Sequence, residues 1–234
     1  MKNSISFRLW GRYALFSDPV TKIGGEKCSY HVPTYEAIKG VLKSIYWKPT
    51  IIWHVDKVRV MWQIKTQTKG TKPLVWSGGN SLAIYTFLHE VEYQVQAHFT
   101  WNLHRPELAQ DRIDGKHYQL AQRMLEKGGR QDIFLGVRDC PAYVEPCEFG
   151  EGKGHYDETP ELSFGLMFHG FDYPDETGKD ELASRFWQAV MRKGVLEFPK
   201  PEGCVIRRSV RKMTAKEFAL HENLLSVEQE EAAL

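Results

Sequence analysis

The chain has 234 residues, of which 42% are hydrophobic and 26% charged, so it can bury the core of one large domain or two modest ones. Its formal net charge of +1 excludes any global electrostatic argument for a nucleic-acid partner. It has no apolar run long enough to cross a bilayer and its first residues lack a secretory signal, so we expect a cytoplasmic protein without a membrane partner.

The first third of the chain shows strand and helix patterns in alternation. Residues 5–16 alternate between apolar and polar and are rich in β-forming residues, which predicts a strand. The next segment is bounded by prolines and has apolar residues every 3.6 positions, which predicts a helix of about three turns that ends at Tyr46 and Trp47. Residues 51–67 predict one long strand, and residues 69–80 predict a loop with turn residues at both ends.

A second strand and helix follow. Residues 91–102 place apolar side chains on one face of a strand, and residues 114–129 predict a helix with Asp114 as its N-cap and a Gly-Gly pair as its stop. Residues 131–146 predict another strand. The resulting order is β-α-β-β-α-β, which predicts an α+β protein with a ferredoxin-like (RNA-recognition-like) domain over residues 1–146.

The composition changes at residue 147, where we expect a smaller β-rich domain over residues 147–234. It begins with an acidic, glycine-rich loop, followed by a predicted strand over residues 162–173 and a predicted helix over residues 180–194. Two short strands, VLEFP and CVIRRSVR, come next. Residues 214–234 predict a weak helix that fades into an acidic tail, for which disorder is one expectation.

Positive charge is unevenly distributed along the chain. Eight Lys and Arg face only two acids between residues 35 and 80: Lys39, Lys43, Lys48, Lys57, Arg59, Lys65, Lys69 and Lys72. The stretch RRSVRK adds four more: Arg207, Arg208, Arg211 and Lys212. Such clusters fit a phosphate-binding face and fit equally well the solvated outside of strands and helices.

Aromatic residues stand among these basic residues, and nucleic-acid bases stack on aromatic side chains. Because aromatic residues in strands are more often core, we expect about a third of them on a ligand face. The set is Trp10, Tyr13, Phe16, Trp47, Trp53, Trp62 and Trp76.

Motifs for metal and nucleotide chemistry are missing from the sequence. It contains no HExxH, no DxD-like cluster, no CxxC, no GxxxxGK[ST] and no GxGxxG, so we expect neither a metal nor another cofactor. The four cysteines are expected to be reduced packing residues: Cys28, Cys140, Cys147 and Cys204.

Lys116 and His117 stand together at the start of the second helix, where the helix dipole disfavours positive charge. Solvated surface groups are the simplest interpretation. However, both helices of this fold lie on one face of the sheet, so Tyr46 at the end of the first helix can lie close to this pair.

A Tyr-Lys-His group has a specific chemical meaning, which is cleavage of RNA without a metal. The 2′-hydroxyl attacks the adjacent phosphorus and the 5′ oxygen leaves, which requires a proton acceptor, a proton donor and a cation. His117 suits proton transfer and Lys116 suits the phosphorane charge. Tyr46 suits orienting the 2′-hydroxyl, or deprotonating it if its pKa falls, so either Tyr46 or His117 can be the base.

Three stretches in order, GRYALFSDP, SYHVPTYEAIKGVLKSIYWKP and FLGVRDCPAYVE, resemble the CRISPR-associated Cas-five family of the RAMP superfamily, in its subtype I-C (Dvulg) branch. The resemblance covers nearly all of the first domain and, more loosely, LMFHGFDYP and FWQAVMRKGVLEFP. It implies metal-independent cutting of CRISPR repeat precursor RNA near the hairpin base, leaving 5′-hydroxyl and 2′,3′-cyclic phosphate ends. It also implies that the family's catalytic residues fall on Tyr46, Lys116 and His117.

The resemblance further implies that the product stays bound by its 5′ handle in an antiviral surveillance complex, beside Cas-seven backbone and Cas-eight large subunits. Trp47, Lys48, Arg138 and the four cations of RRSVRK are candidate RNA contacts, although a structural role for the segment with Arg138 is equally expected. The alternative function is a non-catalytic structural subunit that caps the RNA handle. A generic RNA-binding adaptor is a weaker third reading, since it leaves the Tyr-Lys-His group unexplained.

Overall fold

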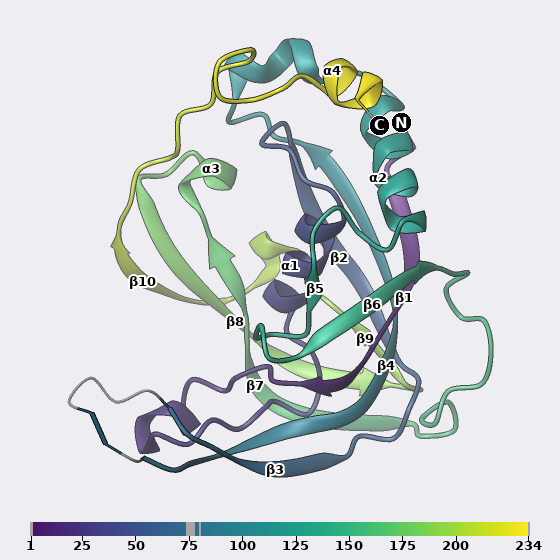
Figure 1. The fold of residues 1–234 in the computed structure, drawn as a ribbon, viewed down its shortest axis with the longest axis vertical. Coiled ribbons are helices and arrows are strands. Elements are labelled where there is room, and N and C mark those ends of the chain that lie inside the picture. The colour runs from purple at the N-terminus through teal and green to yellow at the C-terminus, as the bar shows by residue number, and fades with distance from the viewer. Residues whose placement is uncertain (1, 74–77, 80, 234) are drawn as a thin grey trace.

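The computed structural model describes residues 2–73, 78–79 and 81–233, and within them the protein is α+β, with a mostly antiparallel sheet and few helices (Figure 1). The strands are β1 (Ser4–Ala14), β2 (Ile51–Val60), β3 (Thr66–Thr71), β4 (Ala83–Trp101), β5 (Ile133–Phe134), β6 (Pro141–Pro146), β7 (Glu161–Asp172), β8 (Glu181–Arg192), β9 (Val195–Glu197) and β10 (Ile206–Lys212). The helices are α1 (Tyr35–Ile45), α2 (Lys116–Glu126), α3 (Pro174–Thr177) and α4 (Val227–Ala232). Short 3-10 turns cover Thr21–Gly24, Pro106–Asp111 and Pro201–Gly203.

Four strands of the first half form the centre of the sheet in the order β2-β4-β1-β6, each antiparallel to its neighbour. Helix α1 connects β1 to β2 and packs on β2, whereas α2 follows β4 and packs on β6 and β1. The two helices also contact each other. The sheet continues beyond β2 through β9, β8 and β10, and β7 pairs with β8, so strands of the C-terminal third extend the same sheet.

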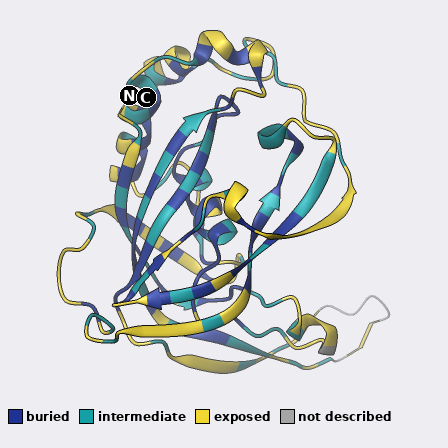
Figure 2. Ribbon diagram, turned by 180° about the vertical axis from the view of Figure 1, so that it is seen from behind, coloured by how far each residue is buried: buried dark blue, intermediate teal, exposed yellow. Residues whose placement is uncertain are grey.

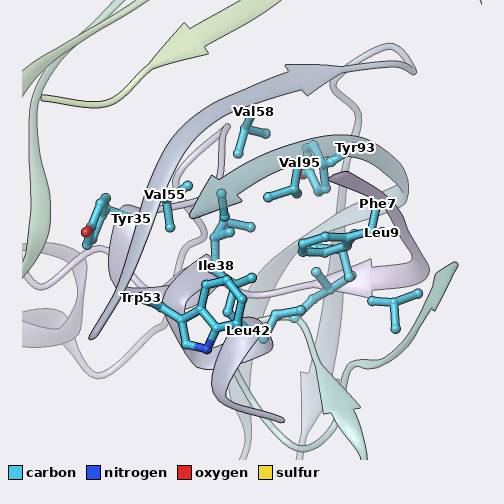
Figure 3. Close-up of a cluster of buried hydrophobic side chains, with 14 of the residues drawn as sticks. Phe7, Leu9, Tyr35, Ile38, Leu42, Trp53, Val55, Val58, Tyr93 and Val95 are labelled. Carbon is cyan, nitrogen blue, oxygen red and sulfur yellow. The ribbon is translucent and has the colours of Figure 1, made fainter. Parts of the chain in front are cut away.

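The core lies between α1 and the central strands (Figure 3). Helix α1 begins where the Thr34 side chain accepts a hydrogen bond from the Ala37 amide at 3.2 Å. Its apolar face, which includes Ile38 and Leu42, is fully buried, and each such side chain contributes about 1.5–3 kcal/mol. The strands meet this face with Phe7, Leu9, Trp53, Val55, Val58, Tyr93 and Val95. This packing fixes the end of α1 relative to the sheet.

The predicted long strand over residues 51–67 is wrong in its second part, because β2 ends at Val60 and a separate strand, β3, begins at Thr66. Both pair with β4, which is longer than predicted. Glu90 within β4 has a φ of 51°, a left-handed conformation that is uncommon in a strand. Strand β4 pairs with β3 up to Leu88 and with β2 from Tyr93 onward, whereas β1 pairs with both parts. The predicted loop over residues 69–80 begins inside β3, and its residues 74–77 and 80 lie outside the described residues.

The predicted strand over residues 131–146 is also divided, into the short antiparallel pair β5 and β6. The chain turns at Gly136, where φ is 89° and where an added Cβ would overlap the carbonyl oxygen of Leu15. Arg138 lies exposed in this turn. The close approach to Leu15 therefore requires a glycine and ends the strand early.

The predicted helix over residues 180–194 is wrong, since this segment forms β8. Trp187, Ala189 and Met191 are buried while Gln188 is exposed, which is the two-residue period of a strand. Trp187 and Met191 also fit a helical spacing of four, which explains the wrong prediction. The segment forms a strand because it pairs with β7 on one side and with β10 and β9 on the other.

The C-terminal segment has less helix than predicted. Between residues 214 and 233 only Val227–Ala232 form a helix, α4, which Ser226 and Gln229 begin with a reciprocal capping box. Helix α4 lies against α2 (Figure 1). None of the described helices is both long and apolar enough to cross a membrane.

Candidate active site

Tyr46 and His117 lie together in the interior. The Tyr46 hydroxyl is 3.0 Å from His117 Nδ1, and both residues are fully buried. Tyr46 is the C-cap of α1, and its carbonyl oxygen accepts a hydrogen bond from the Trp53 indole at 2.7 Å. His117 belongs to the first turn of α2. The expected closeness of these two helix ends is confirmed.

The start of α2 differs from the prediction. Its N-cap is Gly115, with a φ of 81° and no side-chain cap, so the prediction of Asp114 as N-cap is wrong. Asp114 is exposed one residue earlier. The left-handed backbone at position 115 is easily adopted by glycine, and it turns the chain so that His117 faces inward.

The tautomer of His117 follows from its two contacts. Its Nε2 lies 2.7 Å from the main-chain oxygen of Asp111, which can only accept, so Nε2 carries the hydrogen. Nδ1 is then unprotonated and accepts from the Tyr46 hydroxyl. Burial lowers the pKa of His117, and the Asp111 hydrogen bond only partly opposes this shift. The neutral ring can therefore take a proton at Nδ1.

The environment raises the pKa of Tyr46, whereas a tyrosine that acts as a base requires a lowered pKa. Burial raises its pKa, and the carboxylates of Glu230 and Asp111 raise it further, while Arg130 lowers it to a smaller extent. Tyr46 is thus a neutral hydroxyl that donates to His117. A phenolate at Tyr46 does not fit this arrangement.

Asp111 is a member of this cluster that the sequence did not single out. Its buried carboxylate accepts hydrogen bonds from the Thr50 hydroxyl at 2.7 Å and from the Val227 amide at 2.6 Å. Oδ2 also lies 3.6 Å from His117 Nε2. Asp111 therefore ties His117 to the loop after α1 and to the C-terminal segment. Nothing in the local sequence DRIDG, residues 111–115, distinguishes Asp111 from Asp114, so only the fold identifies Asp111.

Lys116 and Lys48 turn their ammonium groups toward the C-terminal segment. Lys116 pairs with Glu231, whereas Lys48, although buried, donates to the Leu225 carbonyl oxygen at 2.9 Å and pairs with Glu230. Trp47 is half-buried and meets the Phe218 ring edge-on, with 6.0 Å between centroids. The candidates from the two helix ends thus gather around one site, although Lys116 has no hydrogen bond to Tyr46 or His117 among the described residues.

The other candidate RNA contacts lie elsewhere. Strand β10 is exposed along its whole length (Figure 2) and stands at the end of the sheet order opposite to β5. Arg207 pairs with Asp172 at 3.3 Å, whereas Arg208, Arg211 and Lys212 have no ion pair among the described residues. Arg138 lies in the turn between β5 and β6.

The basic cluster between residues 35 and 80 does not form one free cationic face. Most of its members are paired with carboxylates: Lys39 and Lys43 with Glu176, Lys48 with Glu230, Lys57 with Glu197, Arg59 with Asp157, and Lys65 with Glu90. Among the aromatic candidates, Phe16 and Trp53 are core residues and Trp62 is exposed. Trp10, Tyr13 and Trp47 are partly buried, and Trp76 lies outside the described residues.

The cysteines and the possible metal ligands are the last side chains that the sequence raised. The four cysteines lie within the described residues and are free, with Cys140 and Cys204 buried. In the described part of the chain, no three His, Cys, Asp or Glu side chains are grouped so as to hold a metal ion.

Comparison with known proteins gives consistent matches over most of the chain. The Cas5d family model, described as "CRISPR-associated protein (Cas_Cas5)", matches residues 4–199. Two proteins called CRISPR pre-crRNA endoribonuclease Cas5d are similar to this chain. The one from Thermus thermophilus is 29% identical and the match covers 83% of this chain and 91% of that protein. The one from Mannheimia succiniciproducens is 27% identical, and the match covers 85% of this chain and 96% of that protein. A solved structure described as a CRISPR-associated protein matches with a TM-score of 0.75 and 32% identity, over 88% of this chain and 96% of that one.

Proposed function

Because the chain belongs to the Cas5d family of CRISPR-associated proteins, as the sequence resemblance indicated, we propose that it is an endoribonuclease that cuts CRISPR precursor RNA in the repeat. The observation that carries this proposal is the buried contact between the Tyr46 hydroxyl and an unprotonated Nδ1 of His117. A neutral imidazole held in one tautomer is suited to accepting a proton.

In the proposed reaction the 2′ oxygen attacks the adjacent phosphorus and the bond from phosphorus to the 5′ oxygen breaks. The Tyr46 oxygen accepts the 2′-hydroxyl proton while its own proton passes to His117 Nδ1, so no free phenolate forms. The imidazolium is stabilised by the Asp111 carboxylate, 3.6 Å away. In this proposal His117 is the base and Tyr46 is the relay, which the raised pKa of Tyr46 and the unprotonated Nδ1 of His117 support.

Lys116 supplies the positive charge for the phosphorane, and its ammonium is an N–H donor that can protonate the departing 5′ oxygen. The products are a 2′,3′-cyclic phosphate and a 5′-hydroxyl. None of these steps requires a metal, so we propose a metal-independent enzyme.

The test is cleavage of a hairpin repeat RNA by the wild-type protein in excess EDTA, beside the same RNA with a 2′-deoxy nucleotide immediately 5′ of the cut. We expect full cutting of the first RNA and none of the second. Cutting that depends on added Mg²⁺, or that proceeds on the 2′-deoxy RNA, would contradict the proposed chemistry.

We further propose that residues 1–146 form a ferredoxin-like, RNA-recognition-like unit, and that residues 147–234 form a smaller β-rich domain with an acidic tail. The strand order β2-β4-β1-β6, with α1 and α2 in contact, supports the first part. After cutting, the protein stays on the 5′ handle in the cytoplasm, within a subtype I-C complex beside Cas-seven and Cas-eight subunits. Trp47, Lys48, Arg138 and the RRSVRK cations are the proposed RNA contacts.

One observation favours a second candidate function, a non-catalytic subunit that caps the RNA handle. Tyr46 and His117 are fully buried, and an inert pair in a structural protein would be buried in the same way. This candidate predicts RNA binding without cutting under every condition, so the assay in EDTA and in Mg²⁺ separates it from the first.

A further inference from the structure

Helix α4 borders the Tyr46–His117 pair, since its Glu230 acts electrostatically on both residues; we call this helix the cover. Helix α4 packs on α2, its first residue Val227 is fully buried, and the Val227 amide donates to Asp111. Since Tyr46 and His117 have no exposed surface, a 2′-hydroxyl cannot reach either of them in this arrangement. Cutting therefore requires an element that encloses the pair, such as the cover, to move.

One turn of α4 pairs with four cations beside the site. Glu230 pairs with Lys48 and Arg130, and Glu231 pairs with Lys116 and, at 3.1 Å, with Arg123. We call Lys48, Lys116, Arg123 and Arg130 the α4-covered cations. They come from the loop after α1, from the start and last turns of α2 and from the loop after it, so only the fold brings them together.

The chemistry of this contact is that of anion recognition. Arginine and lysine bind carboxylates and phosphates with the same donors, so a surface that holds two glutamates can hold phosphates in their place. The contact is also electrostatically coupled to the reacting pair, because Glu230 contributes to the raised pKa of Tyr46.

The attachment of α4 is slight compared with the core. A helix of six residues is not stable alone, and the chain between β10 and α4 has no regular strand or helix among its described residues. Apart from Val227, the buried residue of α4 is the charged Glu230. Elements held by so few apolar contacts are the ones that detach at low free-energy cost.

We infer that the α4-covered cations bind RNA phosphates beside the cut, and that in the RNA-free protein α4 occupies this site as a competing anion. This inference rests on the proposed function and deepens it. It assigns Arg123 and Arg130 to RNA binding and gives the acidic C-terminus a role. RNA displaces α4, the backbone phosphates replace Glu230 and Glu231, and Tyr46 becomes accessible.

The first test compares two charge-matched double variants for binding of the 2′-deoxy-blocked hairpin at fixed ionic strength. Glu230→Gln/Glu231→Gln keeps the helix but weakens its hold on the cations. If α4 is detached in about a tenth of free molecules, this variant binds up to tenfold more tightly than wild type. The control, Glu222→Gln/Glu228→Gln, removes two exposed acids that have no ion pair among the described residues, and its Kd stays within about twofold. Equal affinity of the two double variants, or weaker binding by the first, overturns the inference.

The second test follows the cover itself. When the blocked RNA is added to wild-type protein, the amides of residues 227–232 exchange hydrogen faster, because α4 is displaced. Slower or unchanged exchange while RNA is bound shows that α4 stays in place and overturns the inference. The binding test is repeated with a chain that ends at Leu225 and so lacks α4, which should also bind the RNA more tightly than wild type. Should this shortened chain fail to fold, the result of the Glu230→Gln/Glu231→Gln variant is the one that counts.

These outcomes are separable from those of the proposed chemistry. If the first variant binds tighter and α4 is displaced, but nothing is cut in EDTA or Mg²⁺, the phosphate site stands and the nuclease fails. If wild type cuts in EDTA, but the Glu230→Gln/Glu231→Gln variant binds RNA no more tightly and RNA does not speed hydrogen exchange in α4, the nuclease proposal stands and this inference fails. If no variant binds RNA, both fail.

Discussion

Two clusters of positive charge in this protein differ in their origin and in their surroundings, because RRSVRK is contiguous in the sequence whereas only the fold assembles the α4-covered cations. The α4-covered cations are each neutralised by a glutamate of the chain's own C-terminus. On β10, by contrast, Arg208, Arg211 and Lys212 are exposed and have no ion pair among the described residues. The first cluster surrounds a buried Tyr-His pair, and the second lies at the opposite end of the sheet order from β5.

The difference separates two functions that charge alone cannot separate. An exposed, unpaired cluster supplies long-range, salt-sensitive attraction to phosphate. The covered cluster lies next to the proton-transfer groups, and it can supply positive charge to the RNA only after phosphates have replaced Glu230 and Glu231. We therefore expect changes on β10 to alter affinity alone, changes to the acids of α4 to alter affinity through the covered cations, and changes to Tyr46, Asp111 or His117 to alter the rate of cutting.

The largest expected effect is that of Tyr46→Phe. Removing the hydroxyl breaks the contact to His117 Nδ1 and interrupts the proposed relay, so single-turnover cutting falls by about a hundredfold or more. The control is Tyr118→Phe on the same helix as His117, whose hydroxyl contacts Gln122 on the surface. A loss of the same size in both variants would mean that Tyr46 acts only through the fold.

Asp111→Asn should lower the rate of cutting by about tenfold to a hundredfold, since it acts through His117. The carboxylate favours the imidazolium, so its removal lowers the pKa of His117 and moves the acid limb of the pH–rate profile to lower pH. The exposed Asp114→Asn is the matched control. A reduced rate with an unshifted acid limb would assign Asp111 a purely structural role.

On β10 we expect an effect on affinity without an effect on rate. Arg208→Gln/Arg211→Gln/Lys212→Gln should weaken RNA binding and reduce the slope of log K against log salt by roughly 2, at about 0.7 per phosphate contact. The rate at saturating protein should not change. An unchanged slope, equal to that of the exposed triple variant Arg12→Gln/Lys22→Gln/Lys72→Gln, would place the β10 cations on an inert face.

The smallest effect concerns stability and comes from His169 in β7. His169 is fully buried and stacked on Tyr35 at 4.1 Å, and burial, with Arg185 nearby, lowers its pKa to about 3. Below its unfolded pKa near 6.5, only the unfolded state takes up the proton. His169 therefore stabilises the fold fully above pH 6.5 and progressively less as the pH falls toward 3, by about 1.4 kcal/mol per pH unit.

Urea unfolding between pH 7 and pH 5 measures this slope. His169→Gln should flatten it, whereas His31→Gln, an exposed substitution, should leave it unchanged. Equal slopes in all three proteins would show that His169 takes up its proton equally in the folded and unfolded states.

The local sequence pattern was enough to predict the two helices that carry the site. It was not enough for β8, whose conformation depends on the strands with which it pairs. The apolar spacing of α1 and α2 predicted both helices, and their order placed Tyr46 near His117. The residues of β8 satisfy a helical and a strand period at once, so only the partners β7 and β10 distinguish them. The sequence could not place the acids of α4 at the site, because α4 and its partners Asp111 and Lys116 are more than a hundred residues apart. Asp111 lies only six residues before His117, but no local pattern distinguishes it from Asp114.

The most direct measurement of the central claim is single-turnover cutting of a hairpin repeat RNA by wild type and His117→Ala, with binding measured on the same preparations. We predict that wild type cuts and leaves a cyclic phosphate, whereas His117→Ala binds with similar affinity and cuts at least a hundredfold more slowly. If His117→Ala cuts at the wild-type rate, or if neither protein cuts while both bind, the Tyr46–His117 pair is not the catalytic centre.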